Sequence, residues 1–96
     1  MQNFPYLEQK NGGWVWNFPK SLNMATQVCD FWEIKSPEKI CIKDFTDVDL
    51  PVLYSYKDLR KFSDSLALEL RNRGVGKGDR VGVLLSQEIG CAASHI

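Results

Sequence analysis

Hydrophobic positions recur with a helical period in the second half of the chain. Between residues 56 and 73 they fall at i, i+3, i+4, i+7, i+8 and i+11, which places them on one stripe of a predicted helix. Ser55 and Asp58 have the spacing of a capping box, which satisfies amides at a helix start. The stripe consists of Leu59, Phe62, Ser63, Leu66, Ala67 and Leu70.

The end of this helix is also marked. Gly74 stops it, because glycine takes the left-handed conformation without a steric penalty, and a Schellman ending predicts a contact from Val75 back to Leu70. Glu69 and Arg73 stand four residues apart in the favourable order for an ion pair on a helix surface.

Short apolar runs on both sides of this helix predict strands. Residues 39–45 and 52–55 are separated by a polar turn, which favours an antiparallel hairpin. Residues 80–85 (Arg-Val-Gly-Val-Leu-Leu) form a run that suits a strand covered on both faces, so strand, helix and strand predict a right-handed βαβ crossover with parallel strands. Within residues 39–45, alternation places Ile40, Ile42 and Asp44 on one face and Cys41 on the other.

Two further helices are expected. One begins with Asn23 as its N-cap and ends near Lys35, because the residue before Pro37 is pushed out of helical geometry. The other is capped by Ser86. The first helix has the stripe Ala25, Val28, Cys29 and Trp32, and the second has the stripe Ile89, Ala92, Ala93 and Ile96.

The two ends of the chain have different characters. Residues 1–22 are expected to form an irregular, aromatic-rich arm that lies across a larger body, because exposed aromatic side chains cost free energy in water. At Ile96 the last stripe stops without a cap, a glycine or a basic turn. Residues 23–96 are therefore expected to be an incomplete α/β domain, a helix, a β-hairpin and a βαβα unit, cut in a helix.

Composition changes this picture little. The chain has 96 residues, with twelve Lys plus Arg against twelve Asp plus Glu, so no global field favours nucleic acid or an anionic membrane. Residues 56–80 are locally basic, which favours a solvated helix face over a phosphate-binding patch. The N-terminus lacks the features of a signal peptide, and no run is long enough to span a membrane. Three widely spaced cysteines indicate reduced core thiols in a cytoplasmic protein.

Candidate chemistry is sparse, and we expect no catalytic, cofactor-binding or metal-binding residue in this chain. The glycines of residues 74–78 follow a helix and enter a strand, whereas glycine loops that bind nucleotides leave a strand and open a helix. His95 is the single histidine and lies next to the expected cut at Ile96, so we do not assign it as a base. Ser86 lacks the flanking glycines of a nucleophile elbow. Asp79 and Arg80 are expected to form a local ion pair that orders the turn.

Two segments, taken together, resemble the start of adenylate-forming enzymes, which include acyl-CoA synthetases, luciferases and adenylation domains of peptide synthetases. Residues 55–59 (Ser-Tyr-Lys-Asp-Leu) are similar to the family motif Leu-[Thr/Ser]-Tyr-x-Glu-Leu, with Tyr54 in place of its leucine and Asp58 in place of its glutamate. Residues 74–85 are similar to Gly-Val-x-x-Gly-Asp-x-Val and the apolar strand after it. The opening helix and residues 36–42 resemble short- and medium-chain acyl-CoA synthetases in particular.

The resemblance implies an enzyme that condenses a small carboxylic acid with ATP, aided by Mg²⁺, and passes the acyl group to coenzyme A. It also implies that the phosphate loop, the nucleotide contacts and the catalytic lysine lie beyond residue 96. The 96 residues are then a non-catalytic piece whose partner is the remainder of its own domain. As a separate expectation, the last helix's exposed stripe, Ile89, Ala92, Ala93 and Ile96, could join two fragments as a dimer.

Two alternatives remain open from the sequence. One is another adenylate-forming ligase, such as an aryl-acid ligase or a peptide-synthetase adenylation domain. The other is a small interaction module that is complete at 96 residues and engages a partner protein through its aromatic arm.

Overall fold

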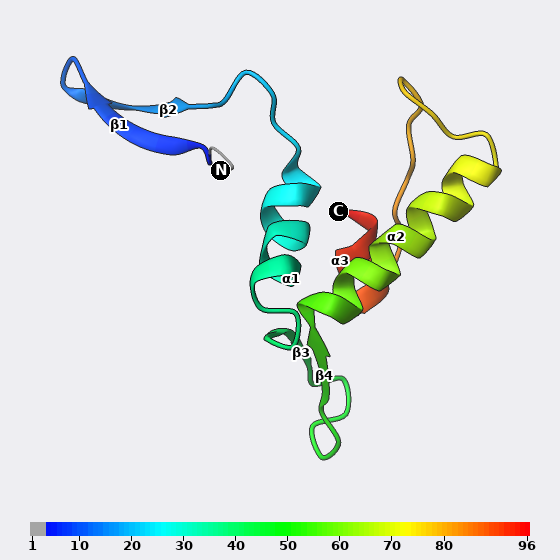
Figure 1. Cartoon of the computed structure of the whole chain (residues 1–96). Helices are drawn as coiled ribbons and strands as arrows, with labels where there is room; N and C mark the ends of the chain where they lie inside the picture. Colours follow the sequence, from blue (N-terminus) through cyan, green and yellow to red (C-terminus); the bar gives the residue numbers. More distant parts are fainter. Residues whose placement is uncertain (1–3) are drawn as a thin grey trace.

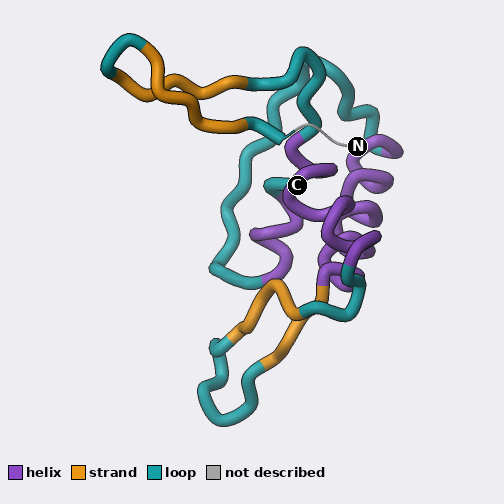
Figure 2. Tube along the Cα trace, turned by 60° about the vertical axis from the view of Figure 1, so that its left-hand side comes forward, coloured by secondary structure: helices purple, strands orange, loops and turns teal. Residues whose placement is uncertain are grey.

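The protein is a mixed α/β chain with two separate antiparallel hairpins and three helical regions (Figure 1). The computed structural model describes residues 4–96. One hairpin projects from the top of the molecule, the helices form the middle, and the second hairpin forms the foot (Figure 2). In chain order the elements are β1 (Tyr6–Lys10), β2 (Gly13–Asn17), a π-helical turn η1 (Thr26–Asp30), α1 (Phe31–Lys35), β3 (Ile40–Asp44), β4 (Val52–Ser55), α2 (Tyr56–Asn72) and α3 (Ile89–Ser94).

The N-terminal arm is a hairpin, so the expectation of an irregular segment is wrong. Asn11 and Gly12 both take positive φ, at 51° and 79°, as a tight two-residue hairpin turn requires. Leu7 pairs with Trp16 across the strands. The period of two is hard to recognise in the sequence because both faces of this hairpin carry apolar side chains. Residues 1–3 of the expected arm lie outside the described residues.

The β1–β2 hairpin also projects away from the helices instead of lying across them (Figure 1). Trp14 and Trp16 are 66% and 58% exposed, and Phe18 stacks on Trp16 with ring centroids 6.2 Å apart. Near its base, Phe4 meets Phe31 edge to face at 5.1 Å. The aromatic surface of the arm is therefore open to solvent.

The first predicted helix is confirmed at both ends. The Thr26 backbone N–H donates to Asn23 Oδ1 at 3.2 Å, which makes Asn23 the N-cap, and helical geometry stops at Lys35. Its middle differs from a regular helix, because the Phe31 N–H donates to the Thr26 carbonyl in the π-helical turn. The wider turn shifts the apolar stripe, so Cys29 is fully buried whereas Val28 is half exposed.

The predicted hairpin of residues 39–45 and 52–55 is confirmed as β3 and β4. Ile40 pairs with Ser55 and Ile42 with Tyr54, so Cys41 is an extra residue, and this irregularity breaks the expected alternation of faces. Cys41 and Ile42 both pack against the core as a result.

Both predicted ends of α2 are present. The Ser55–Asp58 capping box is formed, and Gly74 takes a φ of 86°. The Val75 N–H donates to the Leu70 carbonyl at 3.0 Å and the Gly74 N–H donates to the Arg71 carbonyl at 3.0 Å, which is the hydrogen-bond pattern of a Schellman ending.

The core is small and lies where η1, the β3–β4 hairpin, α2 and α3 meet. Helix α3, which packs against α2 there, is six residues long. Leu59 and Ser63 are buried there, whereas Phe62 is 48% exposed. The buried hydrophobic residues are Cys29, Leu59, Ile89 and Ala93, with Cys41, Ile42, Tyr54, Ala92 and Ile96 packed around them.

The predicted strand at residues 80–85 is not formed, and neither is the parallel βαβ crossover. These residues run as an extended connection between α2 and α3, and Leu84 is 99% exposed. A strand needs a hydrogen-bonded neighbour, and the β3–β4 hairpin lies at the opposite end of α2 from the start of this connection (Figure 1). The apolar pattern alone therefore does not make a strand here.

The last helix differs from its prediction in two ways. Glu88 is its N-cap residue, so Ser86 does not cap it. Its stripe faces the core: Ile89 and Ala93 are buried, and Ala92 and Ile96 pack beside them. The expectation that the stripe Ile89, Ala92, Ala93 and Ile96 is exposed, on which the fragment dimer depends, is therefore wrong, because these side chains pack inside the chain.

Replacing Ser55 by alanine tests the helix cap. The Ser55→Ala change removes the side chain that accepts the Asp58 N–H, and we expect it to lower the free energy of unfolding by about 1 kcal/mol. Urea unfolding followed by circular dichroism measures this change. Ser65→Ala is the matched control, since Ser65 is exposed on the same helix; an equal loss in both variants would contradict the capping role.

Candidate functional site

The motif at residues 55–59 is the joint between β4 and α2. The Ser55 N–H and hydroxyl donate to Asp58 Oδ2 at 2.9 and 3.0 Å, and the Asp58 N–H donates to Ser55 Oγ at 3.2 Å. The next two amides are satisfied from another part of the chain: Tyr56 N–H donates to the Lys39 carbonyl and Lys57 N–H to the Pro37 carbonyl, each at 3.0 Å. Every polar group of the motif that the helix start exposes thus has a structural partner.

Hydrogen bonding also sets the charge state of the cap. Donation from the Ser55 backbone N–H, then from its hydroxyl, holds the pKa of Asp58 below its ordinary value of 3.8. Asp58 is therefore a carboxylate at neutral pH, held as an acceptor by the cap. A carboxylate in this state does not serve as a general acid at neutral pH.

Three of the seven basic residues in the stretch 56–80 form ion pairs. Arg60 donates to Glu33 Oε2 at 2.6 Å and lies 3.8 Å from Asp30 and 3.6 Å from Asp64. The hydrogen bond that Arg60 donates to Glu33, together with these carboxylates, raises the pKa of Arg60 above its ordinary value. Lys57 pairs with Glu38, and Arg73 pairs with Glu69 as predicted. The interpretation as a solvated helix face is supported, and Arg60 ties α2 to the first helix.

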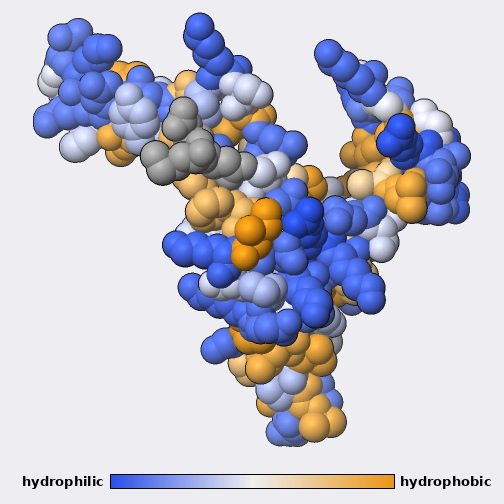
Figure 3. Space-filling view, viewed as in Figure 1, coloured by the Kyte–Doolittle hydropathy of each residue, from blue (hydrophilic) through white to orange (hydrophobic). Residues whose placement is uncertain are grey.

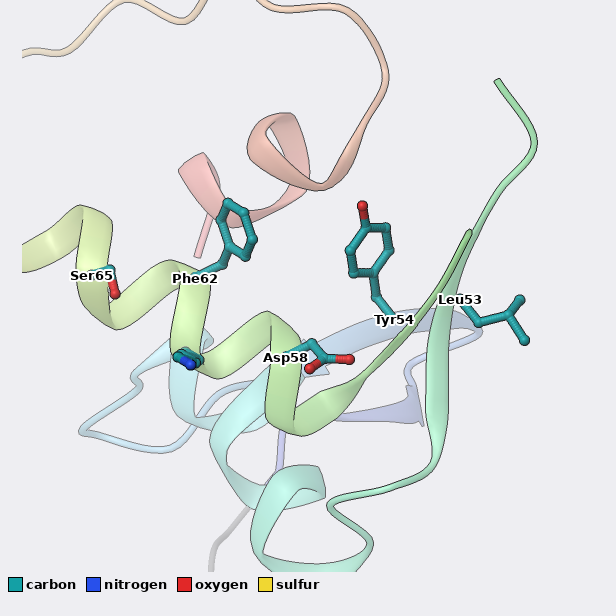
Figure 4. Close-up of a pocket in the computed structure, with 6 residues that line it drawn as sticks. Leu53, Tyr54, Asp58, Phe62 and Ser65 are labelled. Carbon is teal, nitrogen blue, oxygen red and sulfur yellow. The ribbon is translucent and has the colours of Figure 1, made fainter. Parts of the chain in front are cut away.

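A first groove lies in the corner between β4 and α2, with a volume of about 460 Å³. Figure 4 shows the rings of Tyr54 and Phe62 projecting to the same side of the ribbon, while Leu53 points away. The polar residues that line it are Lys61, Ser65, Asp58, whose carboxylate is used by the cap, and Tyr54 through its hydroxyl. The groove offers an apolar contact surface and carries no nucleophile–base pair. Its lining residues are Leu53, Tyr54, Asp58, Lys61, Phe62 and Ser65.

A second groove of about 560 Å³ separates β3 from α3. Its walls mix apolar side chains with charges of both signs, and Cys91 opens into it. The foot of the molecule below it is apolar at the surface, as the space-filling view shows (Figure 3). Its lining residues are Ile42, Lys43, Asp44, Phe45, Thr46, Gln87, Glu88, Cys91 and Ala92.

The three cysteines carry free thiols, as the sequence predicts. Burial, followed by the nearby Asp30 carboxylate, raises the pKa of the Cys29 thiol from 9.0 to about 11. Burial also raises the pKa of Cys41, whose Sγ donates to the Tyr54 carbonyl at 3.5 Å. A nucleophilic cysteine needs a lowered pKa, because the thiolate is the reactive form. The raised pKa values of Cys29 and Cys41 keep both thiols protonated, as expected for groups packed in the core.

The other residues weighed for chemistry are scattered. His95 is exposed, and its Nδ1 lies 2.8 Å from the Cys91 carbonyl. Ser86 lies in the extended connection before α3. The predicted ion pair of Asp79 with Arg80 is replaced by a turn: the Gly76 N–H donates to Asp79 Oδ2 at 2.7 Å, and the Asp79 N–H donates to the Gly76 carbonyl. The glycines of residues 74–78 therefore form a helix stop and a closed turn.

Among residues 4–96, no three metal-ligating side chains come together in a cluster that could hold an ion. Every helix in the same part of the chain is too short or too polar to cross a bilayer.

Sequence reasoning missed the exposed aromatic hairpin and the π-helical turn. The hairpin has a signal that is recognisable in retrospect, since Asn-Gly between two apolar segments is typical of a tight hairpin turn. The π-helical turn has no comparable signal, because it depends on how residues 26–31 pack against α2.

Comparison of the chain with protein-family models, curated proteins and solved structures found no match. The resemblance to adenylate-forming enzymes therefore depends on the motif residues themselves.

Alkylation tests the state of the buried thiol. At about pH 8, a thiol with a pKa about two units above its ordinary value has roughly 100-fold less thiolate. We expect Cys29 to react with iodoacetamide at least about 100-fold more slowly in the folded chain than in urea, as measured by mass spectrometry. Cys91, which opens into the second groove, is the internal control; equal rates at both cysteines would contradict the buried state of Cys29.

The Asp58 cap predicts a dependence of stability on pH. A carboxylate whose folded pKa lies below its unfolded pKa contributes stability above the unfolded value and loses it as pH falls through the folded value. We expect Asp58→Asn to be less stable than the wild type at neutral pH, and this difference to shrink below about pH 4. Urea unfolding across the pH series measures it, and a difference that stays constant into acid would contradict the cap.

Proposed function

We propose that this chain is the opening part of an AMP-forming acyl-CoA synthetase that acts on a short- or medium-chain carboxylic acid. The observation that carries the proposal is the pair of motifs that bracket α2, at residues 55–59 and 74–85. The first supplies the helix cap and the second supplies the helix stop, which gives each motif a physical role at its family spacing.

The uncovered apolar surface supports the same proposal. Phe62 on the α2 stripe is 48% exposed, and the large side chains of residues 81–85 are 40% or more exposed; a chain that packs against a larger α/β body would cover them. The remainder of that domain is the proposed partner. A cytoplasmic location belongs to the proposal and is supported by the three free thiols.

In the proposed reaction the acid's carboxylate attacks the α-phosphate of ATP, which forms an acyl-adenylate and releases pyrophosphate. The thiol of coenzyme A then attacks the acyl carbon and releases AMP. Mg²⁺ would aid the phosphate chemistry. The part of the chain described here would contribute structure: the cap joint, the Arg60 ion pairs and the surface that the rest of the domain packs against.

Pyrophosphate exchange tests the proposal. The protein encoded by the whole reading frame, including any codons after Ile96, is assayed for acid-dependent exchange of labelled pyrophosphate into ATP with acids from acetate to octanoate. We expect exchange with at least one acid and none with the 96-residue chain alone. No exchange with any acid would overturn the proposal. Transfer to a carrier-protein thiol instead of coenzyme A would indicate the peptide-synthetase alternative, and exchange with an aryl acid alone would indicate an aryl-acid ligase.

A second candidate function is a free-standing interaction module. The exposed aromatic surface of the β1–β2 hairpin favours it, because large exposed apolar patches mark binding surfaces. A reading frame that ends after Ile96, together with a cooperative thermal transition and weak binding of hydrophobic dyes, would support the module over the enzyme.

A further inference from the structure

The β1–β2 hairpin keeps its two tryptophans on one face. Residues that pair across the strands share a face, as do residues two apart along a strand, so Leu7 and Gln9 of β1 lie on the same side as Trp14 and Trp16 of β2. Phe18 follows β2 and stacks on Trp16, which extends this side toward the base of the hairpin. These five residues are called the aromatic face, and none of them is charged.

The charged side chains of the hairpin lie on the opposite face. Glu8 and Lys10 belong there, and the Asn17 side-chain amide donates to Glu8 Oε2 at 2.9 Å. A two-stranded hairpin that stands alone is only marginally stable in water. Because this hairpin projects away from the helices in both views, a partner that covers its aromatic face would stabilise it (Figures 1 and 2).

The exposed area of the aromatic face matches what a dimer needs. Phe18 is 63% exposed, Leu7 is 46% exposed, and both tryptophans are exposed by more than half. With roughly 150–250 Å² for each aromatic side chain, the face presents on the order of 500 Å² to water. Two copies packed face to face would bury about 1,000 Å², which is the lower limit for a specific interface.

The chemistry of the aromatic face is complementary to itself. Tryptophan and phenylalanine are enriched at protein interfaces, and charged residues are depleted at their centres. Gln9 is the single amide on this face, and an amide both donates and accepts hydrogen bonds, so it can pair with the same group of a second copy. The net charge of the chain is zero, so two copies do not repel each other at long range.

We propose that the aromatic face of the β1–β2 hairpin is a homodimerisation surface, on which the same face of a second copy packs about a two-fold axis. The buried area is near the lower limit, so the expected dissociation constant is on the order of tens of micromolar. None of these residues belongs to the surface assigned above to the remainder of the domain, and the dimer does not depend on the proposed enzyme activity.

Sedimentation equilibrium of the 96-residue chain, from about 1 to about 500 µM, tests the dimer. We expect a reversible monomer–dimer equilibrium that Trp14→Thr weakens about tenfold or more, because it removes a large apolar side chain from the interface. Val15→Thr is the matched control: Val15 is an exposed apolar residue on the same strand, but it lies on the opposite face. Threonine has a high strand propensity, so both variants keep the hairpin.

A second variant lies outside the strands. Phe18→Ser leaves every paired residue of the hairpin in place, and we also expect it to weaken the dimer about tenfold. Thermal melts by circular dichroism confirm that each variant is folded. In the wild type, tryptophan emission is expected to shift to shorter wavelength as the dimer forms, because Trp14 and Trp16 leave water.

Several outcomes overturn the proposal. A chain that stays monomeric throughout the range rules out the second copy and leaves the aromatic face for a different polypeptide. Equal effects of Trp14→Thr and Val15→Thr would place the contact at the edge of the hairpin instead of its aromatic face. A dimer that survives both Trp14→Thr and Phe18→Ser would place the interface elsewhere. The acyl-CoA synthetase activity is tested separately by pyrophosphate exchange, so failure of one leaves the other intact.

Discussion

The start of α2 is the joint on which the rest of the chain depends. Four backbone donors meet there, and their acceptors come from three places: the Ser55 and Asp58 side chains, the Lys39 carbonyl and the Pro37 carbonyl. Because two of these acceptors belong to the turn after α1, capping the helix also fixes where the first helix ends and where β3 begins. Leu59 then enters the core one residue beyond the capping box, and Arg60 reaches Glu33 on α1. Local and long-range structure are therefore set by the same few residues.

Local signals predicted much of this fold. The capping box, the Schellman ending, the Asn23 cap and the β3–β4 hairpin are all determined by residues close in sequence, so pattern and propensity are sufficient to find them. Those predictions are confirmed because each rests on a hydrogen bond or a backbone conformation that one or two side chains specify.

Features that depend on distant partners were not predictable in the same way. Residues 80–85 have the composition of a buried strand, but a strand exists only beside a neighbour, and this chain places none there. The stripe of α3 looked exposed because its partner, Leu59, is thirty residues earlier in the sequence. For the candidate site, the sequence correctly indicated the capping role of residues 55–59. The two grooves were not predictable, because each is lined by residues from separate elements that only the tertiary structure brings together.

The separation of the β1–β2 hairpin from the core determines what an optical probe of this protein reports. Two of the three tryptophans, Trp14 and Trp16, lie on β2 and are mostly exposed, so their emission reports the hairpin. Trp32 stacks on Tyr56 with ring centroids 6.4 Å apart, at the start of α2, and reports the joint. Total tryptophan fluorescence therefore mixes signals from two separate parts of the molecule, and local opening of the hairpin would resemble unfolding of a molecule whose core is intact.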